Sequence, residues 1–277
     1  MKRYATVLTI AGSDCSGGAG IQADIKTISA LGAYAASAIT AITVQNTLGV
    51  TDIHPIPATF VKGQMISVLT DIRPNAVKIG MVNDINIIHC IASCMHKFKP
   101  QHVIFDPVMV SSSGRRLIDE NTLETLVNEL IPETTLITPN LHEAEVLIGH
   151  PVTNIDEMQK AAKELLKYGS HAVLVKGGHL QGGNMIDVLQ MNQHESPILF
   201  SAPQIESKNT HGTGCTLSSA IATYLALGEN IEQAVKKAKN YLYKGLSAGK
   251  DIHIGEGHGP LNHFYQPEPM HIFDENE

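Results

Sequence analysis

The chain has 277 residues, of which 43% are hydrophobic and 17% are charged, a composition typical of a folded globular protein. Its net charge is −7 and it has no dense cluster of lysine and arginine, so we expect no nucleic-acid partner. Nor does any apolar run reach the roughly 18 residues that a membrane-spanning helix needs, so we expect no membrane partner.

The first residues, MKRYATVLTIAGSD, begin like a secretory signal peptide, with basic residues before apolar ones. The apolar part is too short, however, and it leads into a glycine-rich turn without a small-residue cleavage site. We interpret this segment as the first β-strand of a cytoplasmic protein.

Four cysteines do not suggest a disulfide framework in a chain of this length. They are Cys15, Cys90, Cys94 and Cys215. Cys90 and Cys94 are four residues apart in an amphipathic segment, which favours two buried helix cysteines over a metal site.

Apolar runs typical of strands alternate with helical patterns along most of the chain. Strands are predicted at residues 4–10, 38–44, 76–79, 102–105, 135–138 and 172–175. Helices are predicted at residues 21–31, 58–69, 85–98, 121–130, 141–148, 155–168, 213–227 and 231–244, and a β-ribbon at 185–191 and 198–202. This alternation implies an α/β fold with a parallel sheet that is covered on both faces. No linker or repeat interrupts it, so we expect one domain over 1–277, with a frayed acidic tail from about 267 to 277.

Polar or glycine-rich segments follow the predicted strands. They lie at residues 11–20, 45–46, 78–81, 106–109, 138–143 and 176–179. In an open parallel sheet, ligands bind beyond the carboxyl ends of the strands. We therefore expect an active site at that edge.

The turn NTHGTGC precedes the predicted helix 213–227. The first N–H groups of a helix lack partners within the helix, so the backbone from Gly212 through Thr213 and Gly214 is suited to bind an anion such as phosphate. Cys215 lies in the same positive field, which predicts a lowered pKa and a role as a base. The alternative is a helix that caps itself on Thr213 and buries a small cysteine.

Oxygen-bearing side chains suited to Mg²⁺ follow two of the later strands. They are Asp106, Asn140 and Glu143. Alternatively, Asn140 is only a helix N-cap and Glu143 its capping-box partner. Lys176 precedes two glycines, a position suited to a phosphate charge, although a solvated lysine would look the same in sequence.

Gln45 can donate and accept through one planar amide, which suits the edge of an aminopyrimidine. Met81 offers an apolar surface for a flat ring, although methionine often only fills a core.

Seven segments carry a family resemblance when they are taken in order from residue 8 to residue 222. They are LTIAGSDCSGGAGIQADIKT, LGAYAASAITAITVQNT, VKIGM, DPVM, LITPNLHEAEVL, AVLVKGGH and NTHGTGCTLSSAIA. Together they resemble the hydroxymethylpyrimidine/phosphomethylpyrimidine kinases of thiamine biosynthesis, in the ribokinase-like superfamily. The resemblance weakens in the β-ribbon and after about residue 244.

The resemblance implies a three-layer α/β/α domain and a cytoplasmic homodimer that uses ATP and Mg²⁺. Its substrate would be 4-amino-5-hydroxymethyl-2-methylpyrimidine, which is phosphorylated first to the monophosphate and then to the diphosphate. The implied pyrimidine pocket consists of Gly12, Asp24, Gln45, Met81 and Val108. The implied magnesium and nucleotide residues are Asp106, Asn140, Glu143, Lys176 and Thr210. The implied catalytic residues are the anion hole Gly212, Thr213 and Gly214, with Cys215 where many relatives carry an aspartate base.

Two features remain without an assigned role. Cys15 stands where similar chains often have proline, and residues 111–117 resemble the mobile flap of the family, in which Arg115 or Arg116 could close over phosphates. Three other functions stay open: a pyridoxal kinase, a cysteine hydrolase using Cys215 and His211, and a catalytically silent carrier of pyridoxal phosphate or a nucleotide.

Overall fold

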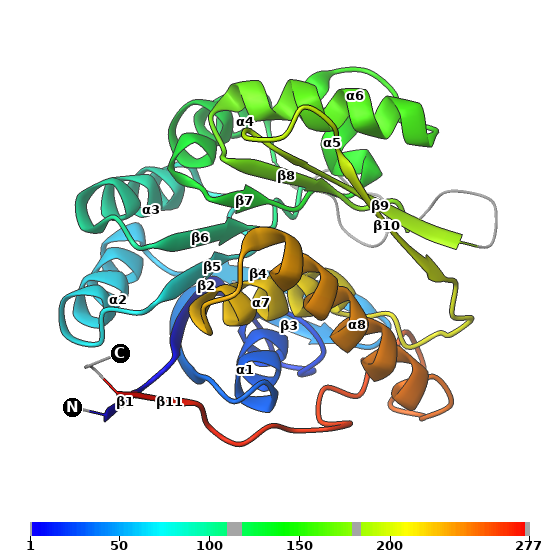
Figure 1. The fold of residues 1–277 in the computed structure, drawn as a ribbon. Helices are drawn as coiled ribbons and strands as arrows, with labels where there is room; N and C mark the ends of the chain where they lie inside the picture. Colours follow the sequence, from blue (N-terminus) through cyan, green and yellow to red (C-terminus); the bar gives the residue numbers. More distant parts are fainter. Residues whose placement is uncertain (1, 110–117, 179–183, 275–277) are drawn as a thin grey trace.

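The computed structural model describes residues 2–109, 118–178 and 184–274 (Figure 1). Its central feature is a nine-stranded sheet. Across the sheet the strands are β10 (Ile198–Pro203), β9 (Asn184–Met191), β8 (Ala172–Val175), β7 (Leu136–Ile137), β6 (His102–Phe105), β5 (Ala76–Ile79), β2 (Thr6–Asp14), β3 (Tyr34–Asn46) and β4 (Gly49–Pro55). The strands from β8 to β3 are parallel to one another, whereas β4 and β9 run antiparallel to their neighbours. The expected mainly parallel sheet is confirmed.

Helices cover both faces of this sheet (Figure 1). One face carries α1 (Gly20–Ala30), α7 (Thr213–Ala226) and α8 (Ile231–Gly249). The other carries α2 (Ala58–Asp71), α3 (Ile85–Phe98), α4 (Glu120–Thr125), α5 (Leu141–Ile148) and α6 (Ile155–Leu165). A π-helical turn (Leu126–Leu130) and 3₁₀ turns (Ile131–Glu133, Leu166–Tyr168) extend two of them. The three-layer α/β/α architecture is therefore confirmed.

The central strands explain why their sequences are apolar without alternation. Successive residues of a strand point to opposite faces, and both faces here are buried under helices. On β2, Val7 packs in the core under α1 and α7, whereas Leu8 packs in the core under α2 and α3. The same alternation continues through β5, β6 and β8, so neither face of these strands is open to a ligand.

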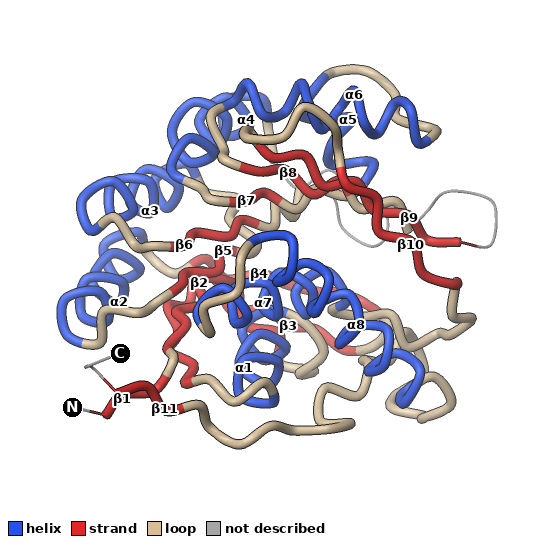
Figure 2. Tube along the Cα trace, in the orientation of Figure 1, coloured by secondary structure: helices blue, strands red, loops and turns tan. Residues whose placement is uncertain are grey.

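Two regions differ from expectation. Strand β4 was not predicted, because all of its side chains are exposed and its sequence shows no buried face. The expected frayed tail is wrong for residues 268 to 274: β11 (Ile272–Asp274) pairs with β1 (Lys2–Tyr4), beside the start of the chain (Figure 2). Before that strand, the N–H groups of Glu268 and His271 donate to the carbonyls of Ala30 and Gly32, so backbone hydrogen bonds hold the segment.

Cys94 is buried on α3 and Cys90 is partly buried there, which confirms the helix-core interpretation; all four cysteines are free thiols. In the part of the chain that the structure describes, none of the helices is both long and apolar enough to cross a bilayer. The expected flap, residues 111–117, lies outside the described residues.

Candidate active site

The turn before α7 is held open by close backbone packing. Gly212 has φ of 79°, and a Cβ there would lie 1.8 Å from the Gly18 carbonyl oxygen, so only glycine fits. The N–H of Thr213 is bonded to the Thr210 carbonyl at 3.3 Å. The N–H groups of Gly214 and Cys215 make no hydrogen bond to the described part of the chain. They remain available to an anion, with the positive end of the helix dipole behind them.

One flank of this turn carries polar or charged groups from three strand ends. Lys176 Nζ lies 2.7 Å from Asp106 Oδ1, which also accepts from Thr138 Oγ1 at 2.9 Å. The second oxygen, Asp106 Oδ2, faces the turn, since a Cβ on Gly214 would lie 3.2 Å from it. Burial would raise the pKa of Asp106, but the ammonium groups of Lys176 and Lys78 outweigh burial and hold it below its usual value. The alternative of a solvated lysine is excluded, because Lys176 is mostly buried and paired.

Asn140 and Glu143 form the capping box that the sequence left as an alternative. Asn140 Oδ1 accepts from the N–H of Glu143 at 2.9 Å, and Glu143 Oε2 accepts from the N–H of Asn140 at 2.7 Å. Burial raises the pKa of Glu143 to about 7; nearby Lys176 opposes this and Asp106 adds to it. Glu143 thus has two roles: it caps the helix, and it belongs to the charged group around Lys176.

Asp106, Asn140 and Glu143 carry oxygen ligands of the kind that Mg²⁺ binds. In the described residues, no group of three histidine, cysteine or acidic side chains is arranged to hold a metal ion by itself. Asp106 Oδ2 is turned toward the anion-binding turn, while the Asn140 side-chain oxygen already caps a helix. Because Mg²⁺ usually keeps several waters and shares its remaining positions with phosphates, one or two carboxylates are enough.

The expected low pKa of Cys215 is wrong. Burial raises the pKa of this thiol to about 11; Lys78 lowers it, whereas Asp24 and Asp106 raise it. The sequence showed the helix N-terminus but not the two carboxylates that distant segments bring near it. A thiol with this pKa is rarely ionised near neutral pH, but its thiolate is a stronger base than that of an ordinary cysteine.

The other flank of the turn brings together most of the expected pyrimidine pocket. A Cβ on Gly12 would lie 3.1 Å from Met81 Cε, so these two residues are in contact. Gln45 lies on β3 where the pairing with β4 is shifted by a bulge, and its backbone N–H and carbonyl both contact Cys15 Sγ, at 3.3 and 3.0 Å. Cys15 therefore has a structural role that the sequence did not reveal: its thiol bonds both backbone groups of Gln45 just beyond the last pair of β2 and β3, Asp14 with Thr43.

Asp24 is not placed like the other pocket residues. Its carboxylate is fully buried and accepts from the side chains of Thr9 and Ser219, at 2.6 Å each, and twice from Lys78 Nζ, at 2.8 and 3.0 Å. Protein donors thus occupy both oxygens. Asp24 is part of the buried structure that supports the site and does not line the pocket. The sequence analysis missed its partner, although a lysine within the apolar run AVKI of β5 was the available signal.

The two remaining expected residues lie at the rim. Val108 is partly buried two residues beyond Asp106, whose carbonyl accepts from its N–H. Thr210 is exposed, and its carbonyl supports the anion-binding turn.

A small cavity of about 240 Å³ adjoins Met81 on the side of β4 and α3, lined also by Thr40, Ile53 and Ile87.

Comparison with known proteins identifies the family of this chain. The family model described as phosphomethylpyrimidine kinase matches residues 14–262. The hydroxymethylpyrimidine/phosphomethylpyrimidine kinase of Rhizobium meliloti is 46% identical over 263 residues, covering 95% of this chain and 98% of that protein. The chain belongs to the phosphomethylpyrimidine kinase family. As a member it is a kinase, and kinases of this family use ATP.

Other relatives include a longer protein, a solved structure of the same family and a kinase named for another substrate. A thiamine biosynthesis bifunctional protein of Geobacter sulfurreducens is 44% identical over 96% of this chain, which spans only 53% of that protein. A crystal structure of the Clostridium difficile 630 phosphomethylpyrimidine kinase has a TM-score of 0.77 at 44% identity and covers 87% of this chain and 99% of its own. A Staphylococcus aureus pyridoxal kinase with AMP-PCP has a TM-score of 0.88 at 32% identity, covering 98% of this chain and 97% of its own. The fold is thus shared by kinases with different acceptors.

Proposed function

We propose that the protein phosphorylates 4-amino-5-hydroxymethyl-2-methylpyrimidine and then its monophosphate, with ATP as donor and Mg²⁺ as cofactor, in thiamine biosynthesis. One observation carries this proposal: the anion-binding turn stands between a pyrimidine side and a phosphate side. His211, at its start, contacts Gln45 at 3.1 Å, and Gly214, inside it, abuts Asp106 and Lys176. An acceptor bound at Gln45 and a triphosphate bound at Lys176 meet at this turn.

In the first transfer the hydroxymethyl oxygen attacks the γ-phosphorus of ATP and loses its proton to the thiolate form of Cys215, as the bond from the γ-phosphorus to the ADP oxygen breaks. The backbone N–H groups of Gly214 and Cys215 stabilise the charge that moves onto the phosphate oxygens. Lys176 holds the transferring phosphate. Asp106 and Glu143 would hold Mg²⁺, which would supply positive charge to neutralise the phosphates.

The second transfer differs in its acceptor. A phosphate monoester is already largely ionised near neutral pH, so its oxygen attacks without giving up a proton. The anion-binding turn and Lys176 serve both reactions, whereas Cys215 as a base serves only the first.

Gln45 favours this acceptor over pyridoxal, the second candidate suggested by the pyridoxal kinase structures. Its amide offers one donor and one acceptor in a plane, which match the ring nitrogen and amino group of an aminopyrimidine. Pyridoxal lacks that amino group.

The test incubates the protein with ATP, Mg²⁺ and the free pyrimidine and follows products by mass, with pyridoxal in parallel. We expect the monophosphate first and the diphosphate later, and slower conversion of pyridoxal. A monophosphate alone removes the second activity from the proposal. Faster phosphorylation of pyridoxal, or no phosphorylation of either alcohol, contradicts it. EDTA serves as the magnesium control.

The protein is also proposed to act in the cytoplasm as a homodimer. Four free thiols suit a reducing compartment. The ribbon of β3 and β4 is an exposed sheet edge with apolar side chains at Ile42, Val44, Val50 and Ile53, which supports a subunit contact there. Light scattering should give twice the mass of the chain, and Val50→Glu should reduce it; a monomer at micromolar concentration contradicts the dimer.

A further inference from the structure

His211 connects two segments that are far apart in the sequence. Its Nε2 lies 2.9 Å from Asp14 Oδ2, at the end of β2, and 3.1 Å from the side-chain amide of Gln45, near the end of β3. The ring is mostly buried, and it packs so closely on Gly18 that a Cβ there would lie 2.3 Å from ring Cδ2. Its orientation is therefore fixed, and the proposed mechanism gives it no role.

Asp14 determines which groups donate in this chain of contacts. Besides facing His211, its carboxylate accepts from the N–H and hydroxyl of Ser16, at 2.8 and 2.7 Å, and from the N–H groups of Gly18 and Ala19, at 3.1 and 2.8 Å. Although burial opposes it, these donors and His211 hold the pKa of Asp14 well below its usual value. An ionised carboxylate can only accept, so His211 Nε2 must carry the hydrogen between them.

The position of that hydrogen determines how the amide of Gln45 is oriented. The structure places Gln45 Nε2 3.1 Å from His211 Nε2, but a protonated ring nitrogen cannot accept from an NH₂ group; the amide is therefore assigned the reverse orientation, with its oxygen facing His211. The other end of the amide leads to the same orientation. That end, placed as Oε1, lies 3.2 Å from Thr43 Oγ1, whose single proton goes to the nearer acceptor, the Ser13 carbonyl at 3.0 Å. Thr43 must then accept, which requires the amide nitrogen on its side.

We propose that His211 is a positioning residue: it fixes the amide of Gln45 with its oxygen toward His211 and its nitrogen toward Thr43. Cys15 already holds the backbone of Gln45, so the amide orientation is the remaining freedom at this position.

This inference rests on the proposed function and specifies how the acceptor lies. One lone pair of the amide oxygen and one N–H of the amide nitrogen remain for the ligand. An aminopyrimidine presents an amino group beside a ring nitrogen, so its amino group binds on the His211 side and its ring nitrogen on the Thr43 side. His211 thereby selects for an acceptor with that donor and acceptor order.

The test is a double-mutant cycle between His211→Phe, which keeps the ring shape without a nitrogen, and Gln45→Ala. His211→Phe should raise KM for the pyrimidine roughly 5- to 30-fold, the effect of one or two hydrogen bonds. It should leave kcat within about threefold and KM for ATP unchanged. It should raise KM for pyridoxal far less than KM for the pyrimidine. In the Gln45→Ala background the same substitution should have no further effect.

His211→Gln places an N–H at similar reach and should recover most of the lost affinity. Thermal unfolding checks that each variant is folded, and His211→Ala replaces His211→Phe in the cycle if the latter is not. Multiplying effects in the double variant, or a loss of kcat at unchanged KM, would overturn the inference, because His211 would then act on the substrate directly. Turnover by the parent protein is measured first, so a failure of the proposed function appears there and not in the variants.

Discussion

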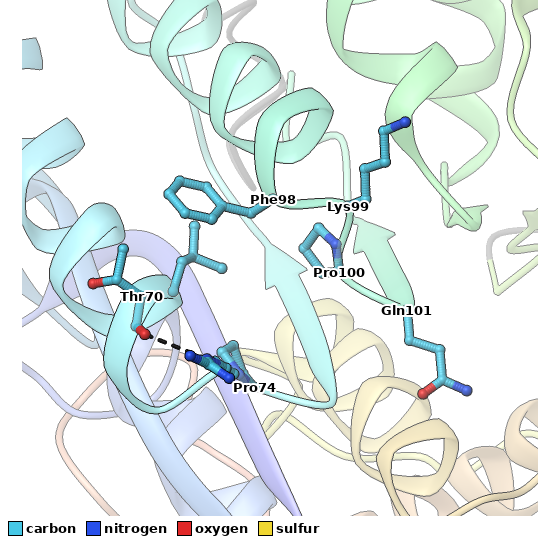
Figure 3. Close-up of a pocket in the computed structure, with 8 residues that line it drawn as sticks. Thr70, Pro74, Phe98, Lys99, Pro100 and Gln101 are labelled. Atoms are coloured by element: carbon cyan, nitrogen blue, oxygen red, sulfur yellow. Dashed lines mark hydrogen bonds between the residues drawn. The ribbon is translucent and has the colours of Figure 1, made fainter.

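The carboxyl and amino edges of the central sheet use charged side chains in opposite ways. At the carboxyl edge Asp14, Asp24, Asp106 and Lys176 are mostly or fully buried and paired, and they come from four different elements. The amino edge has a hollow of about 610 Å³, lined by residues that precede β5 and β6. Figure 3 shows six of them labelled: Thr70, Pro74, Phe98, Lys99, Pro100 and Gln101.

The charges of the amino-edge hollow do not converge. Arg73 Nε turns back to the Thr70 carbonyl at 3.4 Å, and the side chains of Lys99 and Gln101 point away from each other (Figure 3). Hollow volume therefore does not locate the site in this protein. Convergence of buried ionisable groups does, because such groups cost free energy unless they are paired and are concentrated where chemistry needs them.

The largest expected effect is on catalysis at the carboxyl edge. Cys215→Ala removes the proposed base, so the first transfer should slow by about 10²- to 10⁴-fold. The second transfer should slow by less than about tenfold, because its acceptor needs no base. Because burial raises the pKa of Cys215 to about 11, the first transfer in the parent protein should also accelerate as pH rises above 7. Single-turnover assays of both acceptors measure these rates.

Cys90→Ala is the matched control, since this partly buried thiol lies on α3 away from the anion-binding turn. It should leave both transfers unchanged. Equal loss of the two transfers in Cys215→Ala would mean that the thiol supports the turn and does not act as a base.

The next effect is on stability below the site. Lys78→Met leaves the Asp24 carboxylate buried without its cation, so the free energy of unfolding should fall by about 3–5 kcal/mol. Adding Asp24→Asn should restore most of it, because the amide can still bond the hydroxyls of Thr9 and Ser219. Urea unfolding measures both variants. Lys97→Met, at an exposed position of α3, is the control and should change stability by less than about 0.5 kcal/mol; a similar loss there would contradict the buried-pair argument.

A smaller effect depends on pH. The pKa of Glu143 is raised to about 7 in the fold from 4.5, so its protonated form favours the folded state. That contribution is complete below about pH 4.5 and is lost as pH rises through 7. Glu143→Gln keeps the capping box but cannot ionise. The stability of the parent relative to this variant should therefore fall by roughly 2–3 kcal/mol between pH 5 and 8 without nucleotide. A flat difference would place the ionised glutamate in a solvated setting.

The sequence predicts elements well where burial and local signals coincide. Strands β5, β6 and β8 and helices α3 and α5 have the expected bounds, because each combines a buried run or periodic face with clear ends. Strand β4 forms a hairpin with β3 but exposes every side chain, so it shows no buried face in the sequence. The pair β1–β11 depends on a remote backbone partner, which no local pattern encodes.

The site divides in the same way. The proximity of Asp106 to Lys176 could be predicted because strand ends meet at one edge of the sheet. The capping box could be predicted because Asn140 and Glu143 are three residues apart. The pairing of Asp24 with Lys78 and the raised pKa of Cys215 did not follow. Both depend on which side chains of α1 and α7 pack against β5, and this packing joins segments that are far apart in the sequence.

The smallest effect tests the amino edge. Lys99 ends α3 with φ of 46°, a left-handed conformation that costs a non-glycine residue about 1–2 kcal/mol. Glycine removes that cost but loses about 0.5–1 kcal/mol through the greater freedom of the unfolded chain. Lys99→Gly should therefore raise the free energy of unfolding by roughly 0.5 kcal/mol, and both transfers should keep their rates. Urea unfolding and the two kinase assays measure this; a clear loss of activity would show that the amino-edge hollow takes part in function after all.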